Sequence, residues 1–379
     1  MNILRRALLC VISSLLIFGI ESVLDKTPSF AASQITVRYG ILEQSLPISD
    51  LRKYAETGKV SSDLQSFLNY IDSDAQQKLQ GALQVKMSLD IAAVDKVLDT
   101  PFAKQILSAV STGIARRDSA GVTALRAAII LGTKSKEGLS VVSFLEAYPS
   151  DRLVVDVPAA LELASQAEKY SINSSNPPAQ DNLSSTPFWR IAIQYQRFAA
   201  QNKQFSGCLF GDSVSAELGS TLGEGNFNFA LNGLSAVSLV EQLKLLAPVK
   251  VKCEKAVIAV GGNDAWYKLS NDVFVNNLRE SIALTRQLGA KQIVLIPGFY
   301  STVAASKDPS ISAPNSRVDE INALIKQVAL AENVPVETLG LETLNEKGAL
   351  KEAFASSDGD HLNDEGIKFY RQALLKIFG

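Results

Sequence analysis

Residues 204–215 read QFSGCLFGDSVS, in which a short apolar run, Gly207–Phe210, ends at the polar turn Gly211-Asp212-Ser213. Four more short apolar runs follow along the chain and alternate with segments of helical periodicity. The runs are Asn226–Leu231, Lys255–Val260, Gln292–Ile296 and Val334–Leu339, and the helical segments are about Leu234–Leu246, Asp272–Leu288, Ser316–Glu332 and Asp364–Phe378. This alternation is typical of a parallel sheet with helices on both faces. We therefore predict an α/β domain built on a five-stranded parallel sheet.

The residues that directly follow these runs are the candidates for chemistry, because open sheets of this type bind ligands outside the carboxyl ends of their strands. Ser213 follows the first run, at a position where serine is also common as a helix cap. Asn232-Gly233 follows the second run, and this pair favours a tight turn. Gly261-Gly262-Asn263-Asp264 follows the third run. Its glycines let the backbone approach a ligand, and the amide of Asn263 can reach a developing oxyanion.

A candidate general base stands near the carboxyl end, in Asp358-Gly359-Asp360-His361. His361 is the single histidine of the chain, so any chemistry that needs an imidazole must use it. An aspartate three residues before a histidine in a loop can bond the imidazole and hold its tautomer. Each of these turns has an ordinary structural explanation by itself. Their combination, in this order at the ends of strands, favours one site that unites Ser213, His361 and Asp358.

The ordered blocks resemble those of the SGNH, or GDSL-type, hydrolase family. The matching residues are Gly211-Asp212-Ser213, Gly233, Gly261-Gly262-Asn263-Asp264 and Asp358 to His361, with Val214 where the family has leucine. The resemblance covers about Phe205–Gly379. It implies a flavodoxin-like three-layer α/β/α domain, to which we assign residues 186–379.

The resemblance also implies a role for each matched residue. Ser213 would attack an ester carbonyl, and His361 would take its proton and later give it to the leaving alcohol. Asp358 would orient His361. The oxyanion hole would consist of the backbone N–H of Ser213, that of Gly233 and the side-chain amide of Asn263. This chemistry needs no metal and no organic cofactor.

The amino-acid composition argues against nucleic-acid binding and against several kinds of metal site. The chain has Lys+Arg 37 against Asp+Glu 39, a formal net charge of -2, without the basic excess of a nucleic-acid-binding protein. One histidine excludes multi-histidine metal sites, and three cysteines are one short of an all-cysteine zinc site. Cys208 and Cys253 could pair in an oxidising compartment, but we interpret them as two small buried hydrophobes.

The N-terminal half, residues 32–170, shows mostly helical periodicity, with one early strand predicted at Gln34–Tyr39. It resembles a bacterial domain of unknown function that usually precedes an α/β-hydrolase lipase domain. The resemblance is carried by YGILEQSL at 39–46, AETGKV at 55–60 and ALRAA at 124–128. Residues 171–185 are polar, include a Pro-Pro pair and are predicted to be a linker. No Gly-x-Ser-x-Gly pentapeptide follows the linker, so we expect this accessory domain to precede a different catalytic fold.

Residues 1–31 have the pattern of a secretory signal peptide. Arg5 and Arg6 precede the uncharged apolar run Ala7–Ile20, and a small-x-small site follows at Ser29-Phe30-Ala31. An uncleaved anchor is the alternative, although the run is short for a bilayer span. We therefore expect export to the periplasm, a thylakoid lumen or the extracellular space. Association with a membrane surface or the envelope stays open.

These inferences predict an exported, lipase-like serine esterase that cleaves carboxylic esters. The first alternative is an O-acyltransferase or deacylase acting on an envelope polysaccharide, because a sugar hydroxyl can replace water as acyl acceptor. A non-catalytic binding protein on the same fold ranks last. We expect an ester or acylated-carbohydrate substrate and no nucleic acid, and the oligomeric state stays open. Trp266 and Tyr267 either wall the pocket or pack in the core, and the long loop Phe299–Pro314 is a candidate lid.

Overall fold

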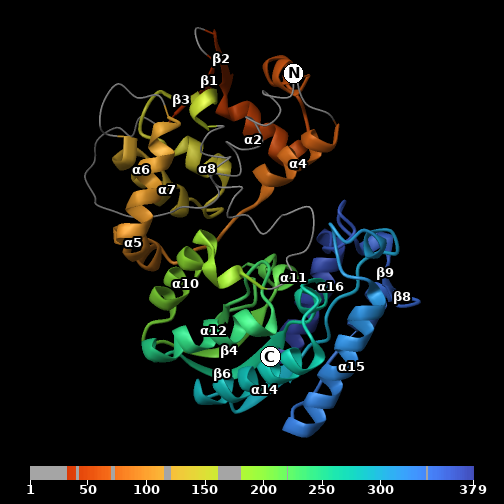
Figure 1. Ribbon diagram of the computed structural model, residues 1–379. Coiled ribbons are helices and arrows are strands. Elements are labelled where there is room, and N and C mark those ends of the chain that lie inside the picture. The colour runs from red at the N-terminus through yellow and green to blue at the C-terminus, as the bar shows by residue number, and fades with distance from the viewer. Residues whose placement is uncertain are drawn as a thin grey trace. The chain divides into compact units, whose positions relative to one another are not determined.

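The computed structural model describes residues 32–39, 42–69, 73–114, 121–160, 181–219, 221–338 and 340–379. The chain forms two compact units, Met1–Tyr170 and Ser171–Gly379, coloured red to yellow and green to blue in Figure 1. The signal segment 1–31 and the linker residues 171–180 lie outside the described residues. None of the helices that the structure describes is long and apolar enough to cross a membrane.

The N-terminal unit is mostly helical, as predicted, and it also contains a three-stranded sheet. The central strand β1 is antiparallel to β2 and parallel to β3. Of the three strands, only β1 matches a predicted one. The described elements are β1 Gln34–Tyr39, β2 Leu42–Pro47, α2 Ile48–Thr57, α3 Ser62–Leu68, α4 Ser73–Gln84, α5 Ile91–Asp99, α6 Pro101–Thr112, α7 Gly121–Thr133, α8 Val141–Glu146 and β3 Arg152–Asp156. Strand β3 escaped prediction because three consecutive residues of it are buried, which removes the alternation of a half-buried strand.

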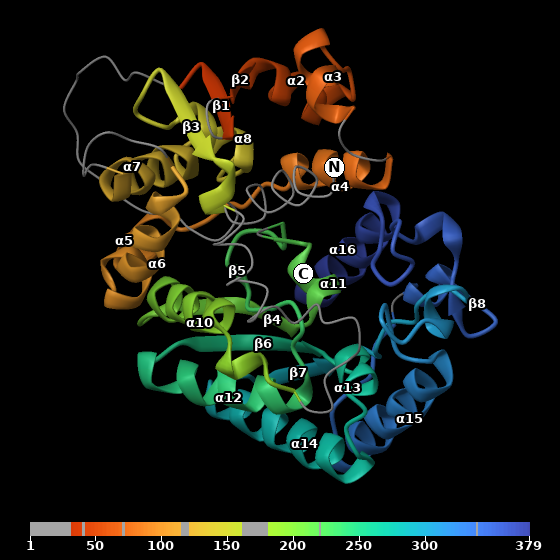
Figure 2. The same ribbon diagram turned by 45° about the horizontal axis from the view of Figure 1, so that its top comes forward.

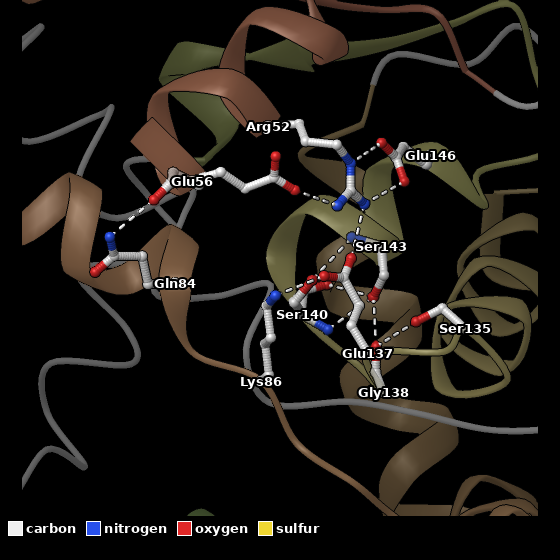
Figure 3. A network of polar contacts seen from close by, with 11 residues as sticks. Arg52, Glu56, Gln84, Lys86, Ser135, Glu137, Gly138, Ser140, Ser143 and Glu146 are labelled. Carbon is white, nitrogen blue, oxygen red and sulfur yellow. Dashed lines mark hydrogen bonds and ion pairs between the residues drawn. The ribbon is translucent and has the colours of Figure 1, made fainter. Parts of the chain in front are cut away.

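One arginine joins three carboxylates inside this unit (Figure 3). Arg52 in α2 makes two hydrogen bonds of 2.6 Å with Glu146 at the end of α8. It also donates to Glu137 at 2.7 Å and to Glu56 at 3.1 Å, and Lys86 lies 2.8 Å from the second oxygen of Glu137. The hydrogen bond with Glu146, followed by that with Glu137, raises the pKa of Arg52 above its usual value. The network therefore fastens α2 to α8 and to the turn before α8.

Four parallel strands form the sheet of the C-terminal unit, in the order β5-β4-β6-β7. Their bounds are β4 Gln204–Gly211, β5 Asn226–Asn228, β6 Lys252–Ala259 and β7 Gln292–Leu295. Each overlaps one of the predicted strands. The parallel topology places the carboxyl ends of all four strands at one edge, which is where the turn residues of interest follow.

The prediction of a fifth strand at Val334–Leu339 was wrong. Residues 334–338, its described part, make one isolated parallel bridge, between Leu295 and Val336. The N–H of Leu295 donates to Pro335 O at 2.9 Å, and the N–H of Glu337 donates to Leu295 O at 3.0 Å. Pro335 has no N–H with which to extend the ladder, so the apolar run lies beside the sheet edge without forming a strand.

Alternating side chains of the strands fill a separate core on each face of the sheet. Phe210 and Ile258 belong to the core beneath α10, α12, α14 and α15, whereas Leu209 and Val257 belong to the core beneath α11 and α16. Figure 2 shows the sheet between these layers. The helices are α10 Pro187–Ala200, α11 Ser213–Ala216, α12 Ala236–Leu246, α13 Gly262–Trp266, α14 Asn271–Gln287, α15 Asn315–Glu332 and α16 Asp364–Phe378, and a small hairpin consists of β8 Asn345–Glu346 and β9 Ala349–Leu350. The three-layer α/β/α arrangement agrees with the prediction, with four strands in place of five.

Cys208 and Cys253 form a disulfide, which corrects the interpretation of two unpaired cysteines. Both are fully buried, at 0% and 1% exposure, so the expected burial was correct. They lie on the neighbouring strands β4 and β6 with their Cα atoms 5.8 Å apart, a separation that a disulfide spans. The sequence could not reveal this proximity, because it depends on which strands become neighbours.

Candidate active site

Ser213 is the first residue of α11, directly after β4, and therefore stands at the carboxyl edge of the sheet. It is not the helix cap, which is the alternative that its position suggested. That role belongs to Asp212, whose Oδ1 accepts a hydrogen bond of 3.2 Å from the N–H of Val214. The sharp turn before the serine needs glycine, because a Cβ on Gly211 would lie 2.3 Å from the Oγ of Ser215.

His361 connects Ser213 to Asp358 through its two ring nitrogens. Nε2 lies 2.8 Å from Ser213 Oγ, and Nδ1 lies 2.8 Å from Asp358 Oδ2. The other carboxylate oxygen, Oδ1, accepts hydrogen bonds from the N–H of His361 at 3.0 Å and from Ser356 Oγ at 2.6 Å. The carboxylate is therefore held by the backbone and side chains of its own loop. An imidazole held in this way can take a proton from a serine hydroxyl.

The charges around His361 favour its protonated form. Burial by itself would lower the pKa of His361, but the hydrogen bond with Asp358 and the negative charges of Asp360 and Glu217 raise that pKa to about 9. Burial would likewise raise the pKa of Asp358, yet the hydrogen bond and charge of His361 hold it well below its usual value. Asp358 is thus ionised at neutral pH, and His361 must lose a proton before it can act as a base.

A pocket opens beside Ser213 and encloses a space of about 460 Å³, part of it open to solvent. Its walls come from the β4–α11 turn, α13, the loop Phe299–Pro314, α15 and the loop before His361. The lining residues are Asp212, Ser213, Val214, Gly262, Asn263, Trp266, Phe299, Ser301, Ser312, Ala313, Val318 and Asp360. The loop Phe299–Pro314 thus forms a wall of the pocket.

Two carboxyl groups give this pocket an acidic side. Burial raises the pKa of Asp212 to about 7 and that of Asp360 to about 6, although the positive charge of His361 opposes both shifts. Asp360 stands between the two matched residues of its block, and Asp212 belongs to the first block. Their positions in these blocks are the sequence signal for both carboxyl groups. Ser301 and Ser312 also line this pocket, and the sequence pointed to them only through the candidate lid Phe299–Pro314, without singling out either serine.

Trp266 and Tyr267 were each expected either to wall the pocket or to pack in the core, and the structure gives one residue each role. Trp266 lines the pocket, and its indole N–H donates to Pro309 O at 3.0 Å. Tyr267 is only 1% exposed and packs in the interior. Its hydroxyl donates to Gly233 O at 2.9 Å. One residue therefore walls the pocket, while the other supports the turn that contains Gly233.

The three candidate oxyanion donors differ in whether they line the pocket and in the hydrogen bonds that they already make. Asn263 lines the pocket with Ser213, and its Nδ2 donates to Leu234 O at 3.2 Å, which leaves its second N–H available. Gly233 lies next to Leu234 with a φ of 78°, but it is not among the pocket-lining residues. The backbone N–H groups of Ser213 and Gly233 donate to no acceptor within the described part of the chain. Both are thus free to bind a ligand.

Among the described residues, no group of three or more His, Cys, Asp or Glu side chains is arranged to hold a metal ion.

Two family models match this sequence. Residues 207–368 match the GDSL-like lipase/acylhydrolase family, and residues 31–156 match an alpha/beta hydrolase family of unknown function, DUF1400. The C-terminal region is therefore a GDSL-like lipase/acylhydrolase domain. The protein is an ester-hydrolysing enzyme in which this domain follows a DUF1400 region.

Solved structures with a related fold share little sequence with this chain. A lipase/acylhydrolase from Enterococcus faecalis is 19% identical with a TM-score of 0.36 and covers 46% of this chain and 94% of its own. A GDSL-like lipase from Bacteroides thetaiotaomicron is 15% identical with a TM-score of 0.39 and covers 49% and 98%. A catalytic mutant of an acetylxylan esterase from Geobacillus stearothermophilus is 20% identical with a TM-score of 0.37 and covers 48% and 95%. No curated protein matches the sequence significantly.

Proposed function

We propose that this protein is a serine esterase whose catalytic triad consists of Ser213, His361 and Asp358. The observation that carries the proposal is the pair of 2.8 Å contacts that His361 makes, one with Ser213 Oγ and one with Asp358 Oδ2. A serine hydroxyl is a weak nucleophile, and it needs such an oriented base to attack a carbonyl. The family match supports ester bonds as the target.

The reaction would proceed in two halves. In the first half, His361 takes the proton of Ser213 as the oxygen attacks the ester carbonyl, and then gives that proton to the leaving alcohol. In the second half, a water molecule loses a proton to His361, attacks the acyl-serine and releases the carboxylic acid. Asp358 holds the imidazole tautomer and stabilises its positive charge in both halves.

The negative charge on the tetrahedral intermediate needs hydrogen-bond donors. We assign this role to the backbone N–H of Ser213, the backbone N–H of Gly233 and the amide of Asn263. The free N–H groups of Ser213 and Gly233 and the second N–H of Asn263 support the assignment. Removal of one such donor costs roughly 3–4 kcal/mol of transition-state stabilisation.

The test is hydrolysis of p-nitrophenyl acetate, butyrate and octanoate by the full-length protein and by Ser213→Ala. We expect the variant to lose at least about 10³-fold in kcat. Ser215→Ala, on the same helix, is the matched control and should retain most of the activity. A fluorophosphonate should label the wild-type protein and leave Ser213→Ala unlabelled. Equal rates for wild type and Ser213→Ala would refute the proposal.

The polar lining of the pocket favours an acylated carbohydrate over a simple lipid as the natural ester. Ser312 Oγ donates to Ser301 Oγ at 2.8 Å, and both residues line the pocket together with Asp360. Such groups suit an alcohol part that carries several hydroxyls. Deacylation of an envelope polysaccharide, or acyl transfer to one, uses the same three residues. Added sugar acceptors should change the product distribution if transfer occurs, and an unchanged distribution would leave hydrolysis alone.

We further propose that the protein is exported through the signal segment 1–31. The basic residues Arg5 and Arg6 before the run Ala7–Ile20 support this, as does the disulfide Cys208–Cys253, since disulfides persist in oxidising compartments. The test is cell fractionation followed by mass determination of the mature N-terminus. An intact Met1 in the cytosolic fraction would contradict export.

A further inference from the structure

The turn that contains Gly233 is held against a single short helix. We define the oxyanion segment as Asn232–Ala236, which connects the end of the second predicted run to α12. The helix is α13, Gly262–Trp266, which follows β6. Because β6 is bonded to strands on both sides, α13 is attached to a rigid part of the sheet. Contacts from α13 and from its C-cap residue Tyr267 therefore hold the oxyanion segment in position.

Two of these contacts act on neighbouring carbonyl groups. The hydroxyl of Tyr267 donates to Gly233 O at 2.9 Å, and the amide of Asn263 donates to Leu234 O at 3.2 Å. The peptide group between Gly233 and Leu234 is thus fixed at its oxygen by Tyr267. The side chain of Asn263, itself a proposed oxyanion donor, is fixed to the same segment. Two of the three proposed donors are in this way tied to each other.

A third contact closes the other end of the segment. Asp264 Oδ1 accepts a hydrogen bond of 2.9 Å from the N–H of Ala236, the first residue of α12. Asp264 is fully buried, and burial raises its pKa to about 7. Ser235 caps the same helix, with its side chain accepting from the N–H groups of Val237 and Ser238. The C-terminal end of the oxyanion segment is therefore held by Asp264, whereas the position of Gly233 within the segment depends on Tyr267.

Gly233 needs such support more than its neighbours do. Its φ of 78° lies in the left-handed region, which glycine adopts without steric strain. Glycine also loses more conformational entropy than other residues when it is held in one state. Within the described part of the chain, Tyr267 provides the hydrogen bond that its carbonyl accepts. Tyr267 is 1% exposed, so its ring cannot swing away to release the glycine. A freely moving Gly233 would not hold its N–H in one direction.

We propose that Tyr267 is a positioning residue for the oxyanion hole: its hydroxyl orients the Gly233 turn and keeps the N–H of Gly233 aligned with the amide of Asn263. This inference rests on the proposed esterase function. Tyr267 is not among the residues that line the pocket. Its effect reaches the reaction through Gly233, so it should act on the transition state more than on substrate binding.

The experiment compares wild type, Tyr267→Phe and Tyr370→Phe as full-length proteins. Tyr267→Phe removes one buried hydroxyl and retains the ring. We expect kcat to fall about 10-fold while KM stays within about twofold, because the donor is misdirected and not removed. Amide hydrogen exchange of Leu234, whose N–H donates to Leu231 O at 3.1 Å, should become faster in this variant without any substrate present. The rate of labelling by a fluorophosphonate should fall in parallel with kcat.

Tyr370→Phe is the matched control, since Tyr370 is 0% exposed and its hydroxyl bonds the Oγ of Ser215 at 2.8 Å. We expect a similar loss of thermal stability in both variants, but unchanged amide hydrogen exchange of Leu234 in the control. Equal losses of kcat in the two variants, or unchanged amide hydrogen exchange of Leu234 in Tyr267→Phe, would overturn the positioning role alone. A wild type without Ser213-dependent hydrolysis would overturn the proposed function and this inference with it.

Discussion

Ser213 and His361 are 148 positions apart in the chain, yet Ser213 Oγ lies 2.8 Å from His361 Nε2. The serine stands on the turn after β4, and the histidine stands on the loop before α16. Val214 of α11 and the buried side chains Ala373, Leu374 and Ile377 of α16 belong to one hydrophobic core on this face of the sheet. Packing of α16 against the sheet therefore brings the proposed nucleophile and the proposed base into contact.

Replacement of Asp358 by asparagine should reduce kcat by about 10³- to 10⁴-fold. The asparagine amide would favour the wrong tautomer of His361, with the proton on the nitrogen that faces Ser213. The measurement is kcat for p-nitrophenyl acetate, with fluorophosphonate labelling of Ser213 as a second readout. Ser356→Ala, which removes one hydrogen bond to the same carboxylate, is the milder control. A loss below about 10-fold in Asp358→Asn would argue against the triad.

The activity should increase with pH up to about 9. Only the neutral imidazole of His361 can accept the proton of Ser213, and the acidic surroundings raise the pKa of His361 to about 9. The acidic limb of kcat/KM reports the pKa of the free enzyme, so the enzyme should be only partly active at pH 7. The measurement is kcat/KM from pH 5 to 10.

Asp360→Asn tests the cause of that limb. The negative charge of Asp360 contributes to the raised pKa of His361, so its removal should lower that pKa and move the limb to lower pH. Asp272→Asn, on α14 and away from the pocket, should leave the profile unchanged. A limb that stays in place in Asp360→Asn, or that moves upward, would contradict this electrostatic account.

Loss of the Cys208–Cys253 disulfide should destabilise the C-terminal unit by about 2–4 kcal/mol, the typical effect of closing a loop of this order. The cysteines are separated by 45 positions, so the crosslink restricts a sizeable part of the unfolded chain. The measurement is urea unfolding of wild type and of the double variant Cys208→Ala, Cys253→Ala. Reductant should lower the stability of the wild type and have no effect on the double variant. Equal stability of both proteins without reductant would contradict the prediction.

Trp266→Ala should shift the chain-length preference towards longer acyl groups. Trp266 forms part of the pocket wall, and each additional buried methylene contributes about 0.8 kcal/mol. Two more methylenes would then raise the ratio of kcat/KM for octanoate over acetate by about 10-fold. Trp266→Phe retains most of the ring volume but loses the hydrogen bond to Pro309. If Trp266→Phe shifted the preference as strongly, the tether to the loop and not the wall volume would set it.

Much of the C-terminal unit was predictable because its signals are local. Gly211 ends β4 where a Cβ would clash with Ser215, and Gly261 follows β6 with a positive φ, so both glycines have a local backbone reason. Periodicity located α12, α14, α15 and α16. The N-terminal unit was less predictable. The pairing of β1 with β3 joins residues more than a hundred positions apart, and no local pattern identifies such a partner.

The sequence by itself determined the sheet-forming runs, the order of the site blocks and the identity of the only possible imidazole, His361, because these depend on periodicity and residue type. Only the tertiary structure decided that Val334–Leu339 contributes a bridge and no strand, that Cys208 bonds Cys253, and that Trp266 walls the pocket while Tyr267 supports Gly233. These outcomes depend on which strands become neighbours and which side of a turn faces the core. Both are set by packing between segments that lie far apart in the chain.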